Sequence, residues 1–174
     1  MKRMMGAAVL VMALEGLAAI PAMTPVSRGD ADGWWMKRHA AKVAEAKAGG
    51  APVVFLGGDI TWHWTYPDNG KPVWDRYARL GAPKAVNFGV RGDRTEHLLW
   101  RCENGELDGY AASCVVVDAG RIGPALNHLL ATVVRKQPTA HVMLMPELEK
   151  GLSPKDEMAA VYAQVKAFLP KKKP

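Results

Sequence analysis

The sequence contains three short apolar runs that each break at glycine, with charged residues close behind. The first run, residues 52–56, is followed by two glycines and Asp59, and runs at residues 85–88 and 114–117 repeat the pattern. A strand that is buried on both faces of a parallel sheet reads as a continuous apolar run, and ligands bind beyond the carboxyl ends of such strands. The sequence therefore predicts an α/β fold whose parallel sheet has one functional edge.

The segments between these runs have helical patterns. Apolar residues recur at helical spacing after Pro124, which suits the first turn of a helix. Asp93 and Glu96 have the spacing of a capping box, so a helix should begin after Asp93 and continue through Trp100. The predicted architecture is a three-layer, doubly wound sandwich. Two further helices cover residues 34–48 and 73–80, and two more start near residues 124 and 153. A fourth strand covers residues 141–145.

Composition limits both the size of the fold and its partners. A chain of 174 residues with 49% hydrophobic content is enough for one domain with a core. The formal net charge of +6 comes partly from the two ends, at residues 2–3 and 171–173. Nucleic-acid binding needs basic residues gathered on one face, so no nucleic-acid partner is predicted. Cys102 and Cys114 fit neither a disulfide scaffold nor a paired-cysteine zinc site and are predicted to be small core residues.

The N-terminus has the pattern of an export signal. Two basic residues precede an apolar segment, residues 6–20, which is too short to span a bilayer, so stable membrane insertion is not expected. Residues 1–22 are therefore predicted to be a signal peptide of a secreted or periplasmic protein. The alternative is an amphipathic arm that packs on the domain. Residues 23–33 then form a linker, residues 34–170 the domain and residues 171–174 a basic tail.

Asp59 follows the first predicted strand and has several readings. The two glycines before it can make a tight turn, in which case Asp59 caps the next segment. A carboxylate can also act as a covalent nucleophile, but no acid or base partner is evident. A third reading is a metal site with His63, Asp93, His97 or Asp118. We expect no metal, because His63 lies between two tryptophans and His97 lies within a predicted helix.

A long irregular string of residues resembles the SGNH, or GDSL-like, hydrolases. Val-Phe-Leu-Gly and Ile-Thr within residues 54–61 are similar to the first block of that family. Asn-Phe-Gly at residues 87–89 and Gly-Asp-Arg-Thr-Glu-His at residues 92–97 are similar to its second block, which residues 99–107 continue. The string resembles the branch that holds the platelet-activating-factor acetylhydrolase catalytic subunits and bacterial secreted esterases. Beyond Gly120 the resemblance is thin.

The resemblance implies a flavodoxin-like sheet and an ester hydrolase site, but the chain departs from the family at most catalytic positions. Asp59 stands at the position of the nucleophilic serine, and Gly58 stands at the position of the aspartate before it. Gly92 retains the oxyanion glycine. The family's Gly-Thr-Asn falls on residues 120–122, where a hydrocarbon replaces the asparagine amide. The family's closing Asp-x-x-His falls on residues 148–151, and no histidine occurs there.

These departures imply a non-catalytic relative of the hydrolases that keeps a ligand pocket. The alternative is an active ester hydrolase that acts on acetyl groups of carbohydrates or on small acyl esters, as the resemblance alone would imply. Function depends on the site rather than on the fold, and the residues favour the first reading. The expected ligand is a small ester or carbohydrate, with no cofactor. The predicted pocket residues are Gly58, Asp59, Gly92, Asp93, Arg121 and Ile122.

The chain is also short between the third predicted strand and the last helix. Family members carry a further loop, helix and strand there, so the resemblance implies a sheet that is shortened in its C-terminal half and lacks a fifth strand. An uncovered hydrophobic edge strand promotes association. We therefore predict that a homodimer could form through that edge.

Overall fold

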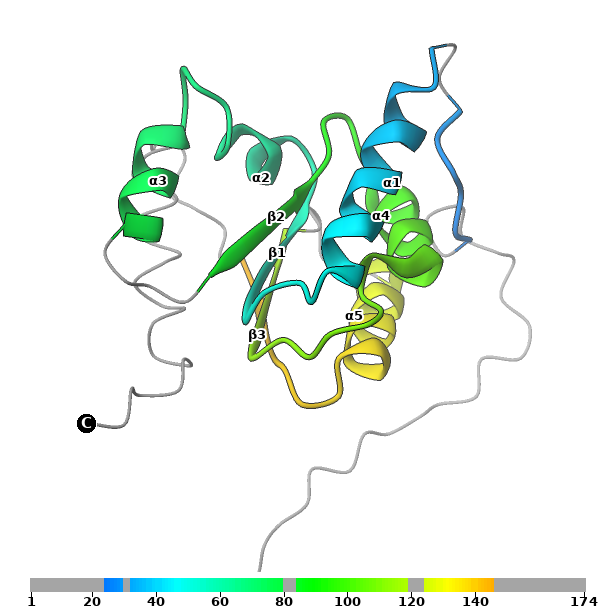
Figure 1. Ribbon diagram of the computed structural model, residues 1–174. Coiled ribbons are helices and arrows are strands. Elements are labelled where there is room, and N and C mark those ends of the chain that lie inside the picture. The colour runs from blue at the N-terminus through cyan, green and yellow to red at the C-terminus, as the bar shows by residue number, and fades with distance from the viewer. Residues whose placement is uncertain (1–23, 30–31, 80–83, 119–123, 146–174) are drawn as a thin grey trace, which may run out of the picture.

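The computed structural model describes residues 24–29, 32–79, 84–118 and 124–145. Within them, four parallel strands form one sheet in the order β2-β1-β3-β4 (Figure 1). This order is that of the first four strands of a flavodoxin-like sheet, and it confirms the predicted α/β class. The strands are β1 (Val53–Gly57), β2 (Ala85–Gly89), β3 (Cys114–Asp118) and β4 (His141–Leu144).

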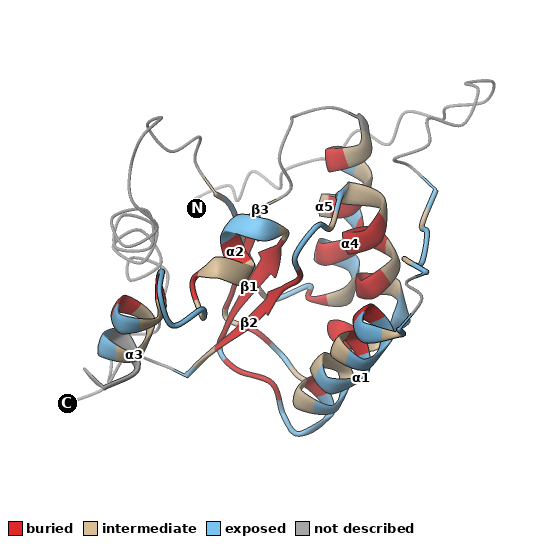
Figure 2. Cartoon of the chain, turned by 90° about the horizontal axis from the view of Figure 1, so that it is seen from above, coloured by how far each residue is buried: buried red, intermediate tan, exposed pale blue. Residues whose placement is uncertain are grey.

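Helices cover both faces of the sheet. Three of them, α1 (Trp34–Lys47), α4 (Thr95–Arg101) and α5 (Pro124–Lys136), lie together on one side (Figure 1). On the other side lies α3 (Lys71–Arg79). The strands β1, β2 and β3 consist almost entirely of buried residues (Figure 2), whereas β4, at the edge of the sheet, is mostly not buried. This burial explains why three of the four strands read as continuous apolar runs instead of alternating patterns.

The two faces of β1 belong to two separate hydrophobic clusters. Val54 and Leu56 pack in a cluster with apolar residues of α4 and α5, including Leu98 and Leu129. Their neighbours Val53 and Phe55 point to the opposite face, because successive side chains of a strand alternate. There they pack with Trp64, with Val73 of α3 and with Val116 of β3.

Both cysteines are buried, which confirms that they are small core residues. Cys102 belongs to the first of these clusters and Cys114 to the second. Burial raises the pKa of the Cys102 thiol to about 12 and that of Cys114 to about 11. Both groups are therefore protonated and unreactive in the folded protein.

The structure corrects two local predictions. Asp59 does not cap the segment that follows the two glycines, because it is the first residue of a one-turn helix, α2 (Asp59–His63), whose N-cap is Gly58. Asp93 does not cap α4. The N-cap is Arg94, whose backbone N–H donates to Nδ1 of His97 at 3.1 Å. Asp93 is unavailable as a cap because its carboxylate binds other groups within the protein core.

Several predicted features lie outside the described residues. These are the signal peptide, the helix starting near residue 153 and the basic tail, together with Arg121 and Ile122. Within the residues that the structure places, no helix is long and apolar enough to cross a membrane. In the same part of the chain, β4 forms one edge of the sheet. The homodimer through that edge stays a prediction.

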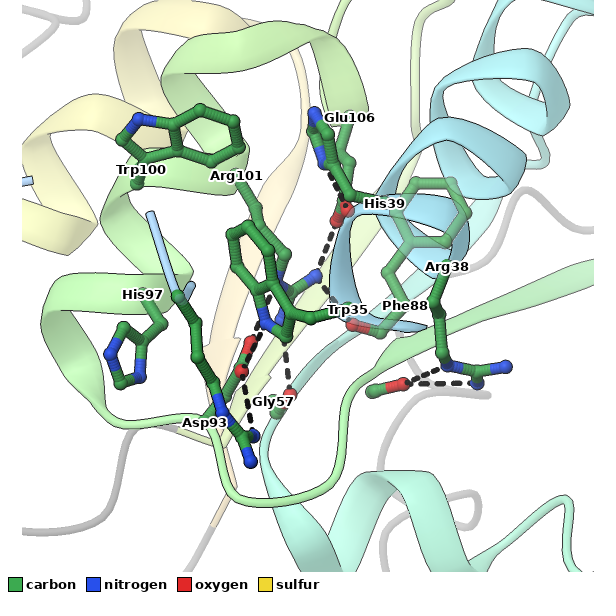
Figure 3. Close-up of polar contacts among 12 residues, drawn as sticks. Trp35, Arg38, His39, Gly57, Phe88, Asp93, His97, Trp100, Arg101 and Glu106 are labelled. Atoms are coloured by element: carbon green, nitrogen blue, oxygen red, sulfur yellow. Dashed lines mark hydrogen bonds and ion pairs between the residues drawn. The ribbon is translucent and has the colours of Figure 1, made fainter. Parts of the chain in front are cut away.

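A buried arginine at the end of α4 connects the strand ends to the loops around them (Figure 3). Arg101 donates through Nε to Oδ2 of Asp93 at 2.7 Å and through Nη1 to a carboxylate oxygen of Glu106. It also donates to the carbonyl of Phe88 at 2.9 Å and to that of Gly57 at 3.2 Å. One guanidinium therefore joins the carboxyl ends of β1 and β2 to the Asp93 loop and to the π-helical turn η2 (Cys102–Glu106).

Helix α1 supplies the remaining partners of this network. The indole N–H of Trp35 donates to Oδ1 of Asp93 at 2.7 Å, and Nδ1 of His39 makes a 2.9 Å hydrogen bond to Oε1 of Glu106. Burial disfavours the charged form of Arg101, but the two carboxylates beside it raise its pKa overall, so it remains a cation. Burial raises the pKa of Asp93, against the opposing pull of Arg101.

Replacement of Arg101 by methionine should destabilise the protein severely. The change leaves two buried carboxylates without their cation and two buried carbonyls without a donor, and breaking a buried pair costs about 3–5 kcal/mol. Urea unfolding measures the loss. The matched control is Arg135→Met, because Arg135 is 62% exposed and lies 4.0 Å from Glu103. That variant should lose no more than about 1 kcal/mol. Equal losses in the two variants would show that the network does not hold the fold.

Candidate functional site

The candidate site lies at the carboxyl ends of β1 and β2, where the sequence predicted a functional edge. The two strands are parallel and pair Gly57 with Gly89, so the segments that follow them start side by side. The N–H of Val90 donates to the carbonyl of Gly57 at 3.1 Å, which extends this pairing into the second loop. At the end of β2, the carbonyl of Gly89 accepts hydrogen bonds from Arg38 of α1 (Figure 3).

The structure brings two of the predicted site residues into direct contact. Oδ1 of Asp59 accepts the backbone N–H of Gly92 at 3.1 Å. The resemblance predicted Asp59 at the nucleophile position and Gly92 at an oxyanion position. The carboxylate of Asp59 therefore accepts the N–H of the glycine that was predicted to be an oxyanion donor.

Backbone geometry explains why glycine stands at two positions of the site. Gly92 has φ +75°, a left-handed conformation that side chains rarely adopt. Gly58 lies so close to the neighbouring loop that a Cβ there would be 2.9 Å from the carbonyl oxygen of Asp93. The aspartate that the family carries at this position would not fit without a shift of the Asp93 backbone.

Asp93 was predicted as a pocket residue, but its side chain lies in the buried network instead. Its carboxylate is fully buried and bound by Trp35 and Arg101 (Figure 3). Asp93 therefore fixes the shape of the loop that presents Gly92. It does not meet Asp59 through a hydrogen bond in the described part of the chain. Arg121 and Ile122 lie outside that part, so their relation to Asp59 stays a prediction.

All five histidines of the chain lie in the described part of the structure. His39 binds Glu106, and His97 accepts the N–H of Arg94. The ring of His63, in α2, packs against the rings of Trp62 and Tyr66. His128 belongs to α5, and His141 begins β4 at the amino end of that strand. Asp118 accepts a hydrogen bond from Thr61 at 3.1 Å.

The alternative of a metal site gains no support from this arrangement. A metal needs several ligand atoms that converge on one point. Within the ranges that the structure describes, no group of three or more histidine, cysteine, aspartate or glutamate residues could hold an ion. His97 in particular uses Nδ1 to cap its own helix.

Sequence reasoning missed two arginines that shape the site. Arg101 was part of the string that resembles the hydrolases, but an arginine in a predicted helix normally faces solvent, so nothing marked it as buried. Arg28 was assigned to a linker. The structure places Arg28 across the Gly92 loop, where its Nη1 donates to the carbonyl of Arg91 at 2.6 Å.

Comparisons with known proteins find relatives that are all named as subunits of one enzyme. The chain is 33% identical over 141 residues to platelet-activating factor acetylhydrolase IB subunit alpha1 of Homo sapiens and of Pongo abelii. These matches cover 75% of the chain but only 58% of each relative. The alpha2 subunit of Rattus norvegicus is 28% identical over 167 residues, which are 88% of the chain and 69% of that subunit. No family model matches the chain.

The parallel α/β fold and these relatives agree on the class of protein. The fold is consistent with a flavodoxin-like SGNH hydrolase. The similarity to the platelet-activating factor acetylhydrolase IB subunits supports a GDSL/SGNH-like hydrolase relationship. The chain spans about 58% of the length of the alpha1 subunits that it matches.

Protonation of His97 should loosen the start of α4. Burial lowers the pKa of His97 below its ordinary value of 6.5. Just below that pH the folded state binds fewer protons than the unfolded state, so stability should fall as the pH drops. Glutamine at the same position can accept the Arg94 N–H without titrating. We expect the unfolding free energy of His97→Gln to change less than that of the parent between about pH 7.5 and about pH 5.5.

Urea unfolding at the two pH values measures this difference. Parent and variant share the four other histidines. Only the difference between the two proteins in how unfolding free energy changes with pH is therefore attributed to His97. An identical slope in parent and variant would contradict the assignment of His97 as a neutral capping acceptor.

Proposed function

We propose that this protein is a non-hydrolytic relative of the acetylhydrolases that retains a ligand site at the carboxyl ends of β1 and β2. The observation that carries the proposal is the hydrogen bond from the Gly92 N–H to the carboxylate of Asp59 at 3.1 Å. Ester hydrolysis by a serine enzyme needs a hydroxyl nucleophile and a free oxyanion donor. At this site a carboxylate stands in place of the hydroxyl, and it accepts the donor's N–H.

The placement of the histidines supports the same proposal. A serine nucleophile needs a base within hydrogen-bond reach, and histidine is the usual base. His39 and His97 are held in hydrogen bonds to other groups. His141 is the first residue of β4, and its strand runs parallel to β1, so it lies at the amino end of the sheet whereas Asp59 follows the carboxyl end of β1. The ligand expected from the resemblance is a small ester or carbohydrate, bound without a cofactor.

The second candidate function is active ester hydrolysis on acetyl or acyl esters. The names of the relatives favour it, since these proteins are subunits of an acetylhydrolase. In that case the chemistry would have to proceed without a serine at position 59, either through a different nucleophile or through water. Measurement of turnover distinguishes the two candidates.

Replacement of Asp59 by serine should not create a useful esterase. The new hydroxyl would still lack a positioned base, which is worth about 10²–10⁴ in rate, and groups that act as a unit give little when one is restored alone. The measurement is the hydrolysis rate of p-nitrophenyl acetate. We expect the parent to show no turnover above background and the variant to gain less than about 10³-fold.

The matched control is Asp68→Ser, which removes the same charge from an exposed position outside the site. It corrects for any change in background hydrolysis that follows from the charge alone. A gain beyond about 10³-fold that is confined to Asp59→Ser would reveal a base near the site. His63, which lies in the same short helix as Asp59, would then be the first residue to replace.

A further inference from the structure

An N-terminal segment, residues 24–29, lies against the loop that carries Gly92. The N–H of Val26 donates to the carbonyl of Glu96 at 3.2 Å, which attaches the segment to the first turn of α4. Two residues later, Nη1 of Arg28 donates to the carbonyl of Arg91 at 2.6 Å. The same atom lies 4.0 Å from Oδ1 of Asp93. These contacts hold the guanidinium of Arg28 at the Gly92 loop.

Arg28 packs directly on Gly92. A Cβ at Gly92 would lie 2.7 Å from Nη1 of Arg28 and 3.2 Å from its guanidinium carbon, so a side chain there would displace the guanidinium from its present position. The side chain of Arg28 is 36% exposed, so a ligand from solvent can reach it. A guanidinium has five N–H donors. In the described part of the chain, its hydrogen bond to Arg91 uses Nη1.

Gly92, which contacts both Arg28 and Asp59, already binds a carboxylate. The Gly92 N–H donates to Asp59, so this loop binds a carboxylate oxygen of the protein itself. The nearby carboxylate of Asp93 is buried and paired with Arg101, which offsets its charge. Arg91 is exposed and adds a second positive charge to the loop. The surroundings of the Gly92 amide therefore favour an anion.

We propose that the Gly92 amide and the Arg28 guanidinium form a binding site for a small carboxylate, and that Asp59 is a tethered carboxylate competing for the same amide. One oxygen of the ligand would take the Gly92 N–H that Asp59 now accepts, and the other would accept from Arg28. This proposal rests on the proposed ligand-binding function and specifies it. The site would take the acid that ester hydrolysis releases in preference to the neutral ester.

The preference follows from the positive charge of the Arg28 guanidinium and the negative charge of a carboxylate ligand. A carboxylate forms charge-assisted hydrogen bonds with a guanidinium, which are about twice as strong as neutral ones. A neutral ester or amide carries no opposite charge, so it gains less from the same groups than a carboxylate does. The tethered Asp59 is always present at a high effective concentration, so it weakens the binding of any free carboxylate.

The test uses acetate as the probe and the Gly92 amide signal in a ¹H–¹⁵N spectrum as the readout. Asp59→Ala removes the competitor, and we expect it to bind acetate at least about tenfold more tightly than the parent. Asp59→Asn keeps the size of the side chain and removes its charge, so it should also bind acetate more tightly than the parent. The dispersion of each spectrum shows whether the variant is folded.

Arg28→Met in the Asp59→Ala background should weaken acetate binding by about tenfold or more, because it removes the charge-assisted contact. The matched control is Arg91→Met, which removes the same charge from the residue directly before Gly92. We expect its effect to be at most about threefold at fixed ionic strength. Acetamide, which has the shape of acetate without its charge, should produce no comparable shift.

Three results would overturn the proposal. They are an unresponsive Gly92 amide in both Asp59 variants, equal responses to acetate and acetamide, and equal effects of the Arg28 and Arg91 replacements. No ester is present in this assay, so its failure is separate from failure of the proposed function. Turnover of p-nitrophenyl acetate by the parent would overturn the non-hydrolytic role without deciding whether acetate binds.

Discussion

The buried cation Arg101 is the interaction on which the candidate site depends. It fills the space where the ends of β1 and β2 meet α1, and it donates to the carbonyls of Gly57 and Phe88 at those ends. A buried carbonyl that loses its donor costs about 1–3 kcal/mol, so few other side chains could stand in its place. The carboxylate of Asp93 is held by the same guanidinium, and Gly92 precedes Asp93 in the chain. The position of the Gly92 amide therefore follows from a charge pair in the core.

The strands and most helices could be predicted from the sequence because their signals are local. Residues 52–56, 85–88 and 114–117 read as buried strands, and the structure has strands within one residue of each. The short helix at Asp59 could not be predicted, since its first residue is also a common turn residue. The prediction that Asp93 caps α4 was wrong. Asp93 has the spacing of a cap, but its carboxylate is bound by Trp35 and Arg101. Partners that are distant in the sequence cannot be predicted from the spacing of residues.

The candidate site could be located from the sequence but not completed. The resemblance placed Asp59 and Gly92 at corresponding family positions, and the structure joins them with one hydrogen bond. Arg28 was missed because residues 23–33 have the composition of a linker, and composition does not reveal which side chain packs on a distant glycine. The relatives support a hydrolase relationship, whereas the proposed role for the residues at the strand ends is the binding of a carboxylate. The same fold can hold either function, so the site decides between them.

The central claim is that the Asp59 carboxylate binds the Gly92 amide, and scalar coupling across the hydrogen bond tests it directly. In a ¹³C,¹⁵N-labelled sample, we expect a cross-peak between the Gly92 nitrogen and the side-chain carboxyl carbon of Asp59. The internal control is the 2.8 Å hydrogen bond from the Gly89 N–H to Oδ1 of Asn87, which should give the equivalent cross-peak. If the Gly89 peak is present and the Gly92 peak is absent, the Asp59 carboxylate does not accept the Gly92 N–H and the account is wrong.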